Sequence, residues 1–201
     1  MIYLLRHGET SFNRQGRFQG RNDSALTEKG VAQAVAMGAA LAALIGDDRA
    51  GWRIETSPLG RARQTAAIVA EALGLPEARV EPRLIEASYG ALEGLTRPEV
   101  DARWPELVGV QGVFGYAPDG EPLAELDARA RAWLGDRDGR RTIAVAHASI
   151  GRAIRGAYVG AAFEQYRLFE TPQDAFHVLR QGRIERIDCS LAALARGGPR
   201  R

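Results

Sequence analysis

The sequence predicts an α/β fold, a single domain with a mainly parallel central sheet and helices on both faces. Short apolar runs typical of buried strands alternate with longer segments whose apolar residues recur at helical spacing. No repeat, low-complexity tract or linker interrupts this alternation. With 201 residues and 45% hydrophobic content, the chain is long enough to bury one core. We expect one domain over residues 1–195 and a disordered tail over residues 196–201.

The first half of the chain begins with a buried strand over Ile2–Leu5, followed by a polar loop over residues 8–24 that is long enough to carry function. Thr27 is the expected N-cap of an amphipathic helix that continues to Ile45. The elements expected next are a strand over Trp52–Thr56, a helix from Pro58 to Leu73 stopped by Gly74 and Pro76, and an extended segment over Val80–Leu84.

The second half contains a capping box, Thr96 with Glu99, which predicts a further helix with Pro98 in its first turn. Residues 105–122 are rich in Gly and Pro but also carry valines and aromatics, so we interpret them as a lid over the site. The remaining expected elements are a helix over Leu123–Leu134, a strand over Thr142–Ala146, a helix over Ile150–Val159, and a hairpin of Ala175–Arg180 with Arg183–Ile187 turning at Gln181 and Gly182.

Composition excludes several classes of protein. The net charge is only +2 and both signs are interspersed, so we expect no nucleic-acid partner. Cys189 is the single cysteine, which excludes an internal disulfide framework and favours a reducing compartment, by default the cytoplasm. The apolar start is too short for a signal peptide and no later run approaches a membrane span, so we expect no membrane partner. A homodimer is compatible with the sequence.

Two of the three histidines, His7 and His147, each follow a predicted strand directly. A lone histidine is usually a hydrogen-bonded structural residue. Because the carboxyl ends of parallel strands meet at one edge of a sheet, two histidines in this setting predict a shared crevice there. His177 lies alone within a later strand, and we assign it to structure.

Cationic side chains flank the same strand ends. Arg6 precedes His7, and either Arg61 or Arg63 in the following helix could turn toward the crevice. Guanidinium forks and imidazole can bind and stabilise a transferring phosphoryl group without a metal. Glu86 could reach the crevice from another edge, protonate a leaving oxygen, and then take a proton from the water that hydrolyses a phosphoenzyme.

Six motifs together resemble the histidine phosphatase superfamily, and more narrowly its branch of cofactor-dependent phosphoglycerate mutases and small phosphatases. The resemblance spans residue 1 to about Arg155 in the family's order. The motifs are RHGETSFN at 6–13, GRFQG at 16–20, ALTEKG at 25–30, SPLGRARQTA at 57–66, RLIEASYGALEG at 83–94 and the later His147.

The resemblance implies a phosphoglycerate mutase-like fold and assigns roles to particular residues. His7 would be the nucleophile that becomes phosphorylated, Arg6, Arg61 and His147 would bind the phosphoryl oxygens, and Glu86 would be the proton donor. The pattern R-A-x-Q-T selects Arg61 over Arg63. The further substrate-binding candidates are Asn13, Gln19, Thr10, Ser11 and Ala148.

The chain departs from the family pattern after His147, where many relatives have two glycines and this sequence has Ala148 and Ser149. If the backbone there needed a positive φ, Ala148 would be strained by roughly 1 kcal/mol or more. Ser149 could instead cap the following helix. The phosphate pocket is therefore less certain on this side than at His7.

We expect a metal-independent, histidine acid-type phosphomonoesterase that acts on a small phosphorylated metabolite. A mutase needs extra cations for a second anionic group, and these are scarce because Ala87 follows Glu86 where the family's mutases have arginine. A phosphoglycerate mutase remains the main alternative, and a phosphate-binding module without turnover is the second. No Walker-type loop and no cluster with metal-ligand spacing occurs, so we expect no cofactor and no metal.

Overall fold

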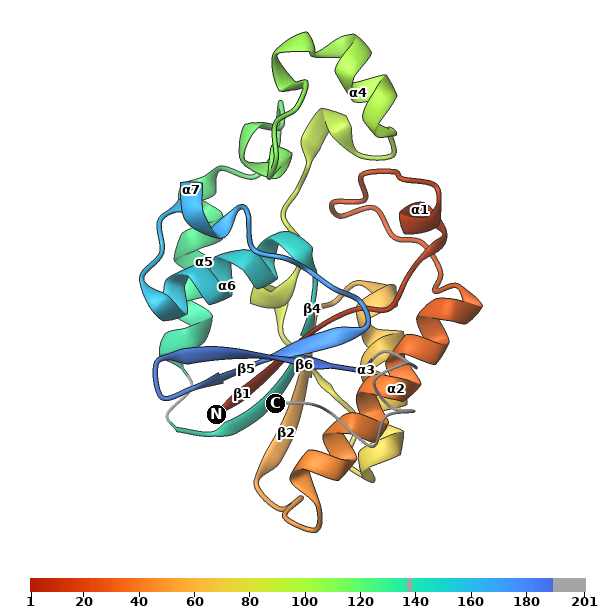
Figure 1. Ribbon diagram of the computed structural model, residues 1–201, viewed down its shortest axis with the longest axis vertical. Coiled ribbons are helices and arrows are strands. Elements are labelled where there is room, and N and C mark those ends of the chain that lie inside the picture. Colours follow the sequence, from red (N-terminus) through yellow and green to blue (C-terminus); the bar gives the residue numbers. More distant parts are fainter. Residues whose placement is uncertain (137–138, 190–201) are drawn as a thin grey trace.

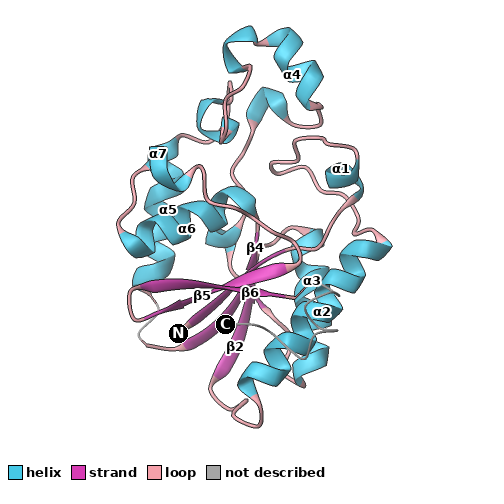
Figure 2. Ribbon diagram, in the orientation of Figure 1, coloured by secondary structure: helices cyan, strands magenta, loops and turns pink. Residues whose placement is uncertain are grey.

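The computed structural model describes residues 1–136 and 139–189. The predicted disordered tail, 196–201, and the end of the predicted domain lie outside the described residues. Over the described ranges the chain forms an α/β sandwich with a central sheet, helices on both of its faces and a smaller group of short helices beyond one end of it (Figures 1 and 2). The predicted fold class is confirmed.

The central sheet has six strands in the order β3-β2-β4-β1-β5-β6. Pairing is parallel from β3 through β2 and β4 to β1, and antiparallel from β1 to β5 and from β5 to β6. The two strands at the centre, β4 and β1, read as near-continuous apolar runs because both of their faces are covered. The strands are β1 Ile2–Arg6, β2 Trp52–Thr56, β3 Arg79–Val80, β4 Arg141–Ala146, β5 Ala175–Arg180 and β6 Arg183–Asp188.

Four long helices cover the sheet, two on each face. One face packs against α2, Glu28–Ile45, and α3, Gly60–Leu73, through a core that includes Met37, Leu41 and Val69. The other face packs against α5, Leu123–Gly135, and α6, Ala148–Val159. The two cores hold the strand ends rigidly, which is what a site at the carboxyl edge of the sheet requires.

The helix and turn signals in the sequence act as predicted. The Thr27 side chain accepts a hydrogen bond from the Gly30 N–H and caps α2, and Gly74 ends α3 in the left-handed conformation. The hairpin between β5 and β6 turns on Gln181, φ 50°, and Gly182, φ 73°. Two positive φ values match the right-handed twist of the strands that they join.

Several boundaries differ from the prediction, among them the start of α6, which begins at Ala148 rather than Ile150. The polar loop over residues 8–24 contains a one-turn helix, α1 Ser11–Arg14, which a capping box of Thr10 and Asn13 starts. α3 begins at Gly60 rather than Pro58, because Leu59 is still extended. The extended segment expected over Val80–Leu84 pairs only as the two-residue strand β3 and then becomes a 3₁₀ turn, Pro82–Leu84, since proline cannot donate to a ladder.

The short helices beyond the sheet form a third, smaller core. α4, Arg97–Arg103, starts at the predicted capping box of Thr96 and Glu99. Its Val100 packs with Leu92, Leu107 and Val113. The other short helices of this group are the 3₁₀ turns Gly90–Leu92, Pro105–Leu107 and Val113–Tyr116. The short helix α7, Phe163–Tyr166, packs instead with α6, in the core on the same face of the sheet as that helix.

One helix, α2, is long and apolar enough by length and composition to cross a membrane, which the sequence prediction had excluded for every segment. Its buried residues, including Ala34, Met37 and Leu41, lie in the core of the fold. In this structure α2 is therefore a core helix, and its apolar face is already partnered by the sheet and α3.

Candidate active site

The two predicted histidines meet at the carboxyl edge of the sheet. β2, β4 and β1 are parallel neighbours, and Ser57, His147 and His7 follow them directly. The His7 N–H donates to the Ala146 carbonyl at 3.1 Å, and the Ser57 N–H donates to the Val145 carbonyl at 3.0 Å. The ladder thus continues one residue past the strands, and the rings of His7 and His147 lie with centroids 5.1 Å apart.

The contacts of His7 determine which of its ring nitrogens can react. Nδ1 lies 2.8 Å from the Gly8 carbonyl oxygen, which can only accept, so Nδ1 carries the proton. Nε2 accepts a hydrogen bond from Arg61 Nε at 3.2 Å. Gly8 itself is required, because a Cβ there would collide with the Gly30 carbonyl. His7 is therefore held as the tautomer whose lone pair is on Nε2.

The surroundings also keep His7 neutral. Burial, with the nearby charges of Arg6 and Arg61, holds the pKa of His7 well below its usual range. A neutral imidazole is the form that can act as a nucleophile. The arginines therefore disfavour protonation of the ring while supplying positive charge beside it.

His147 is equally buried, and its pKa is also held well below its usual range by burial and by its neighbours His7, Arg61 and Arg6. Its Nε2 lies 2.7 Å from Ser57 Oγ. Two buried atoms at the site, His147 Nδ1 and Arg6 Nε, have no hydrogen-bond partner among the described residues. Because buried polar atoms are nearly always paired, such atoms indicate a place where a ligand or water belongs.

Arg61 connects His7 to the loop after Gln19. Its Nη2 donates to the Gly20 carbonyl at 2.8 Å, and its Nη1 donates to the Asn22 carbonyl at 2.6 Å and to Asp23 Oδ1 at 3.1 Å. Asp23 also accepts from the Gly60 N–H at 2.5 Å and so caps α3 from outside, since Leu59 makes no side-chain cap. Asp23 thereby fixes both the start of α3 and the arginine that it carries.

Glu86 lies at the start of α6, next to His147. Its carboxyl oxygens accept from the backbone N–H groups of Ala87 at 2.9 Å, Ser149 at 3.1 Å and Ile150 at 3.1 Å. The orphan N–H groups of a helix start are natural partners for a carboxylate. These contacts fix Glu86, which is only 4% exposed, at the wall of the site.

A cavity of about 130 Å³ brings together most of the predicted residues. Besides His7 and Arg61, five other predicted site residues line it. Four more residues, which were not candidates in the sequence, also line the cavity. The predicted ones are Arg6, Asn13, Gln19, Glu86 and Ala148, and the additional ones are Arg17, Phe18, Gly20 and Tyr89. The signal was available, since the first three additional residues lie within the GRFQG motif and Tyr89 lies within RLIEASYGALEG.

The weaker candidates in the first loop have structural contacts. Thr10 is fully buried, and its hydroxyl accepts from Gln19 Nε2 at 2.8 Å. Asn13 Oδ1 accepts from the Thr10 N–H and, at 2.9 Å, from Gln173 Nε2. Ser11 is the first residue of α1 and does not line the cavity. Asn13 and Gln19 thus lie at the cavity wall, while Thr10 holds both of them.

The departure after His147 is resolved by the geometry of α6. His147 is the N-cap, so Ala148 is the first helical residue, and its φ is not positive. The strain considered for Ala148 does not arise. The prediction that Ser149 caps the helix is wrong, because Ser149 is already inside it, and its hydroxyl lies 2.7 Å from the Tyr89 hydroxyl.

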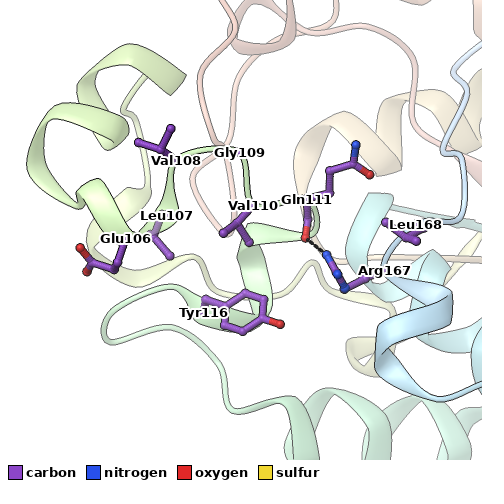
Figure 3. Close-up of a pocket in the computed structure, with 9 residues that line it drawn as sticks. All are labelled: Glu106, Leu107, Val108, Gly109, Val110, Gln111, Tyr116, Arg167 and Leu168. Carbon is purple, nitrogen blue, oxygen red and sulfur yellow. Dashed lines mark hydrogen bonds between the residues drawn. The ribbon is translucent and has the colours of Figure 1, made fainter.

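A second, larger cavity of about 840 Å³ lies between residues 106–111 and the pair Arg167 and Leu168, with Tyr116 at its wall (Figure 3). It contains neither histidine of the site. The predicted lid, 105–122, lines this cavity and not the one at His7. Its Phe114 instead stacks behind Tyr89, with ring centroids 6.4 Å apart, so the segment supports the site wall from outside.

In the described ranges, no group of three or more His, Cys, Asp or Glu side chains is arranged to hold a metal ion. The chemistry offered by the cavity is that of imidazole, guanidinium and carboxyl groups. Three cationic side chains, Arg6, Arg17 and Arg61, line the cavity, which suits it to an anionic group.

A parallel-centred sheet with two histidines at neighbouring strand ends and arginines beside them is the arrangement that the sequence motifs predict. The family model of the histidine phosphatase superfamily (branch 1) matches residues 2–186, and this chain belongs to that superfamily. The motif resemblance found in the sequence is therefore confirmed.

Relatives within the superfamily carry different names. A protein of Enterobacter sp. (strain 638) named "Probable phosphoglycerate mutase GpmB" is 39% identical over 155 residues, which cover 73% of this chain and 68% of that protein. The structure of a mycobacterial glucosyl-3-phosphoglycerate phosphatase in complex with VO3 matches with TM-score 0.75 and 28% identity, covering 88% of this chain and 92% of that one. The structure of YhfR from Bacillus stearothermophilus matches with TM-score 0.74 and 27% identity, covering 92% and 93%.

Proposed function

We propose that this protein is a metal-independent phosphatase that hydrolyses small phosphate monoesters through a phosphohistidine at His7. The observation that carries the proposal is the orientation of the His7 ring. Its Nδ1–H donates a hydrogen bond to the Gly8 carbonyl, so the lone pair is on Nε2, which lies beside Arg61. Both residues line a cavity that Arg6 and Glu86 also line. A structural relative, the mycobacterial glucosyl-3-phosphoglycerate phosphatase, was solved in complex with VO3, a small oxyanion, which supports a ligand of phosphoryl size for this chain.

In the first half-reaction, Arg61 Nε gives up its hydrogen bond to His7 Nε2 and turns to a phosphoryl oxygen, and the freed Nε2 attacks the phosphorus atom of the ester. The new N–P bond forms as the ester P–O bond breaks, and the leaving oxygen takes a proton from Glu86, which enters this step as the protonated acid. Arg6, Arg61 and His147 bind the non-bridging oxygens, whose charge is stabilised by donors that are already in place. The products are the free alcohol, phosphohistidine and the Glu86 carboxylate.

In the second half-reaction, water attacks the phosphorus atom and the N–P bond breaks. The Glu86 carboxylate takes a proton from the attacking water, so the group that acted as an acid acts next as a base. Inorganic phosphate leaves, and His7 returns to its neutral tautomer. The same two residues therefore serve both steps without an external cofactor.

Hydrolysis is favoured over mutase activity by the partners of the outer cations. A mutase must retain a second anionic group on its substrate. Arg17, the lining cation outside the phosphoryl cluster, lies 3.7 Å from Glu99 and donates to the Gly94 carbonyl at 2.7 Å. Arg21 lies 3.6 Å from Glu121. The mutase remains the alternative, because the curated relative from Enterobacter carries that name.

Two measurements test the proposal together. The wild-type protein should release phosphate from p-nitrophenyl phosphate, and a rapid quench with ³²P-labelled substrate should give an acid-labile label at His7. His7→Ala should lose the label and reduce kcat by on the order of 10⁴-fold or more, as expected when a covalent route is removed. A label on another residue would overturn the mechanism, and stimulation by bisphosphoglycerate with phosphoglycerate as substrate would favour the mutase.

A binding module that keeps the phosphate pocket without turnover is the second alternative. It requires wild-type protein to bind phosphate yet release none from any substrate. The buried, free Cys189 supports a reducing compartment, for which we propose the cytoplasm. The homodimer, and the absence of nucleic-acid and membrane partners, stay predictions.

A further inference from the structure

The wall of the cavity formed by Phe18 and Tyr89 is aromatic. These two rings lie edge to face with centroids 5.9 Å apart, and both line the cavity. Phe114 stacks on the outer side of Tyr89 at an interplanar angle of 18°. Tyr89 is therefore held between two rings, which fixes the place of its hydroxyl beside the charged groups of the cavity.

A pair of hydroxyl groups adds a polar feature to this wall. The hydroxyls of Tyr89 and Ser149 lie 2.7 Å apart, and the Ser149 N–H donates to Glu86. The pair thus lies beside the proposed proton carrier. It has two hydroxyl hydrogens, of which one is shared between the partners. The other can be donated to a ligand, and of the two residues it is Tyr89 that lines the cavity.

The Tyr89 hydroxyl stays protonated at neutral pH and therefore remains a hydrogen-bond donor. Burial and the neighbouring Glu86 raise the pKa of Tyr89 above its ordinary value. Among the described residues that line the cavity, the cation outside the phosphoryl cluster is Arg17, and it is already bound to Glu99 and to the Gly94 carbonyl. A carboxylate on the leaving group would have to displace these contacts.

We propose that Phe18, Tyr89 and Ser149 form the leaving-group subsite, and that this subsite selects small, neutral leaving groups that carry hydroxyls, the class of polyol and sugar phosphates. The parts of Phe18 and Tyr89 that line the cavity would contact the carbon skeleton, and the Tyr89 hydroxyl would donate to a hydroxyl oxygen near the ester. The proposal rests on the proposed phosphatase function. It adds the substrate class and the residues that discriminate within it.

The sharpest test uses two substrates with the same three-carbon skeleton. Glycerol 3-phosphate and 3-phosphoglycerate differ at the terminal group, a neutral hydroxymethyl in the first and a carboxylate in the second. The wild-type enzyme should have a kcat/KM at least about tenfold higher for glycerol 3-phosphate, because a desolvated carboxylate without a partner is costly. A hexose 6-phosphate extends the test to a ring, and p-nitrophenyl phosphate serves as a substrate whose leaving group carries no added hydroxyl.

Three variants connect the preference to the hydroxyl pair. Tyr89→Phe keeps the ring and should lower kcat/KM for glycerol 3-phosphate about tenfold, the effect of one lost hydrogen bond, and should lower it clearly less for p-nitrophenyl phosphate, whose leaving group has no hydroxyl to accept that bond. Ser149→Ala should have a smaller effect in the same direction. The double variant should be no worse than Tyr89→Phe, because the two hydroxyls act as one unit.

Tyr116→Phe is the matched control. Tyr116 lies at the wall of the other cavity, where its hydroxyl donates to Glu164 at 3.3 Å (Figure 3). It loses the same atom as Tyr89→Phe and should retain the wild-type kcat/KM for both substrates. Thermal unfolding of all variants confirms that each is folded at the assay temperature.

Several results would overturn the subsite. Equal or better turnover of 3-phosphoglycerate would contradict the neutral leaving group. Equal losses for glycerol 3-phosphate and p-nitrophenyl phosphate in Tyr89→Phe would mean that the hydroxyl acts on the phosphoryl group or on the fold. In both cases labelling of His7 and turnover of p-nitrophenyl phosphate would persist, so the phosphatase would stand. Loss of the label and of all turnover in wild-type protein would overturn the function itself, and the subsite with it.

Discussion

Two buried histidines in this fold accept a hydrogen bond from an arginine, and only one of them lies at the site. Arg61 Nε donates to His7 Nε2 at 3.2 Å, and Arg155 Nη1 donates to His177 Nε2 at 2.9 Å. Both arginines also bind backbone carbonyls, Arg61 on the loop after Gln19 and Arg155 at Gly151 and Glu170. In each case burial and neighbouring arginines lower the pKa of the imidazole.

The two pairs differ in the space that they face and in what surrounds it. His7 follows a parallel strand and opens on a cavity of about 130 Å³ that a carboxyl group and further arginines line. His177 lies within β5 and borders a cavity of about 20 Å³, room for roughly one water, whose lining also includes Arg6 and His147. A lowered histidine pKa is therefore not enough to identify a nucleophile. Its place at a strand end, beside a ligand-sized cavity, makes the difference.

Removing the arginine of each pair should have the largest and most unequal effects on activity. Arg61→Ala removes the donor to His7 and a charge from the phosphoryl group, so kcat/KM should fall by about 10²–10³-fold. Arg155→Ala should destabilise the protein, because buried acceptors lose their partner, and should leave kcat/KM within about threefold. Steady-state kinetics on p-nitrophenyl phosphate, at a temperature where both variants are folded, measures the contrast.

Urea unfolding of the two variants provides the control. Comparable losses of unfolding free energy would show that the difference in activity is not a difference in folded fraction. If Arg155→Ala lost as much activity as Arg61→Ala with the protein fully folded, the assignment of His177 to structure would be wrong.

The sequence predicts which histidines follow a strand directly and which one lies within a strand. Apolar runs predict β1 and β4, and residues directly after parallel strands must meet at one edge, so His7 and His147 could be placed together without coordinates. The motif pattern then selects Arg61 over Arg63, and the structure places Arg61 against His7. Local signals such as Thr27, Gly74 and the Gln181-Gly182 turn predict where elements begin and end.

Contacts between residues far apart in the chain could not be predicted in this way. Asp23 meets Gly60 and Arg61 only because the first loop folds back over α3. Tyr89 and Ser149 are 60 residues apart, and no periodicity relates their hydroxyls. The segment at 105–122 was predicted as a lid because valines and aromatics favour burial, but composition does not say against which surface they pack.

Asp23 tests whether the orientation of Arg61 matters for the activity of the Arg61–His7 pair. Asp23→Ala removes the cap of α3 and a partner of Arg61, so we expect a loss of about 1 kcal/mol in unfolding free energy. Because Arg61 loses one of the contacts that orient it, kcat/KM should also fall by roughly tenfold, within the range seen when supporting residues are removed. Asp23→Asn keeps an acceptor for the Gly60 N–H and should retain most of the stability.

Thr96→Ala is the matched cap deletion. Thr96 starts α4 in a capping box with Glu99, outside the lining of the site cavity. It should cost a similar amount of stability and leave kcat/KM unchanged. If Asp23→Ala behaved like Thr96→Ala in both measurements, Asp23 would be a helix cap without influence on Arg61.

The smallest expected effect is that of the Arg155–His177 pair on how the unfolding free energy depends on pH. Burial, with the charges of Arg155 and Arg186, lowers the pKa of His177 to about 3. Below pH 6.5, the ordinary value, the unfolded chain binds a proton at this position that the folded chain does not, so the unfolding free energy falls as pH decreases toward 3. The stabilisation is complete above the unfolded pKa and is lost progressively within this window.

His177→Gln keeps an acceptor for Arg155 and removes the titration. Urea unfolding between pH 4 and pH 7 should give a slope against pH that is smaller than in wild type by at most about 1.4 kcal/mol per pH unit. The slope should not vanish, because His7 and His147, whose pKa values are also lowered by burial, contribute in the same direction. The fall of kcat/KM at acid pH should be the same in His177→Gln as in wild type, because we assign that fall to protonation of His7. A shift of this part of the pH profile would mean that the two histidine–arginine pairs are coupled through the sheet.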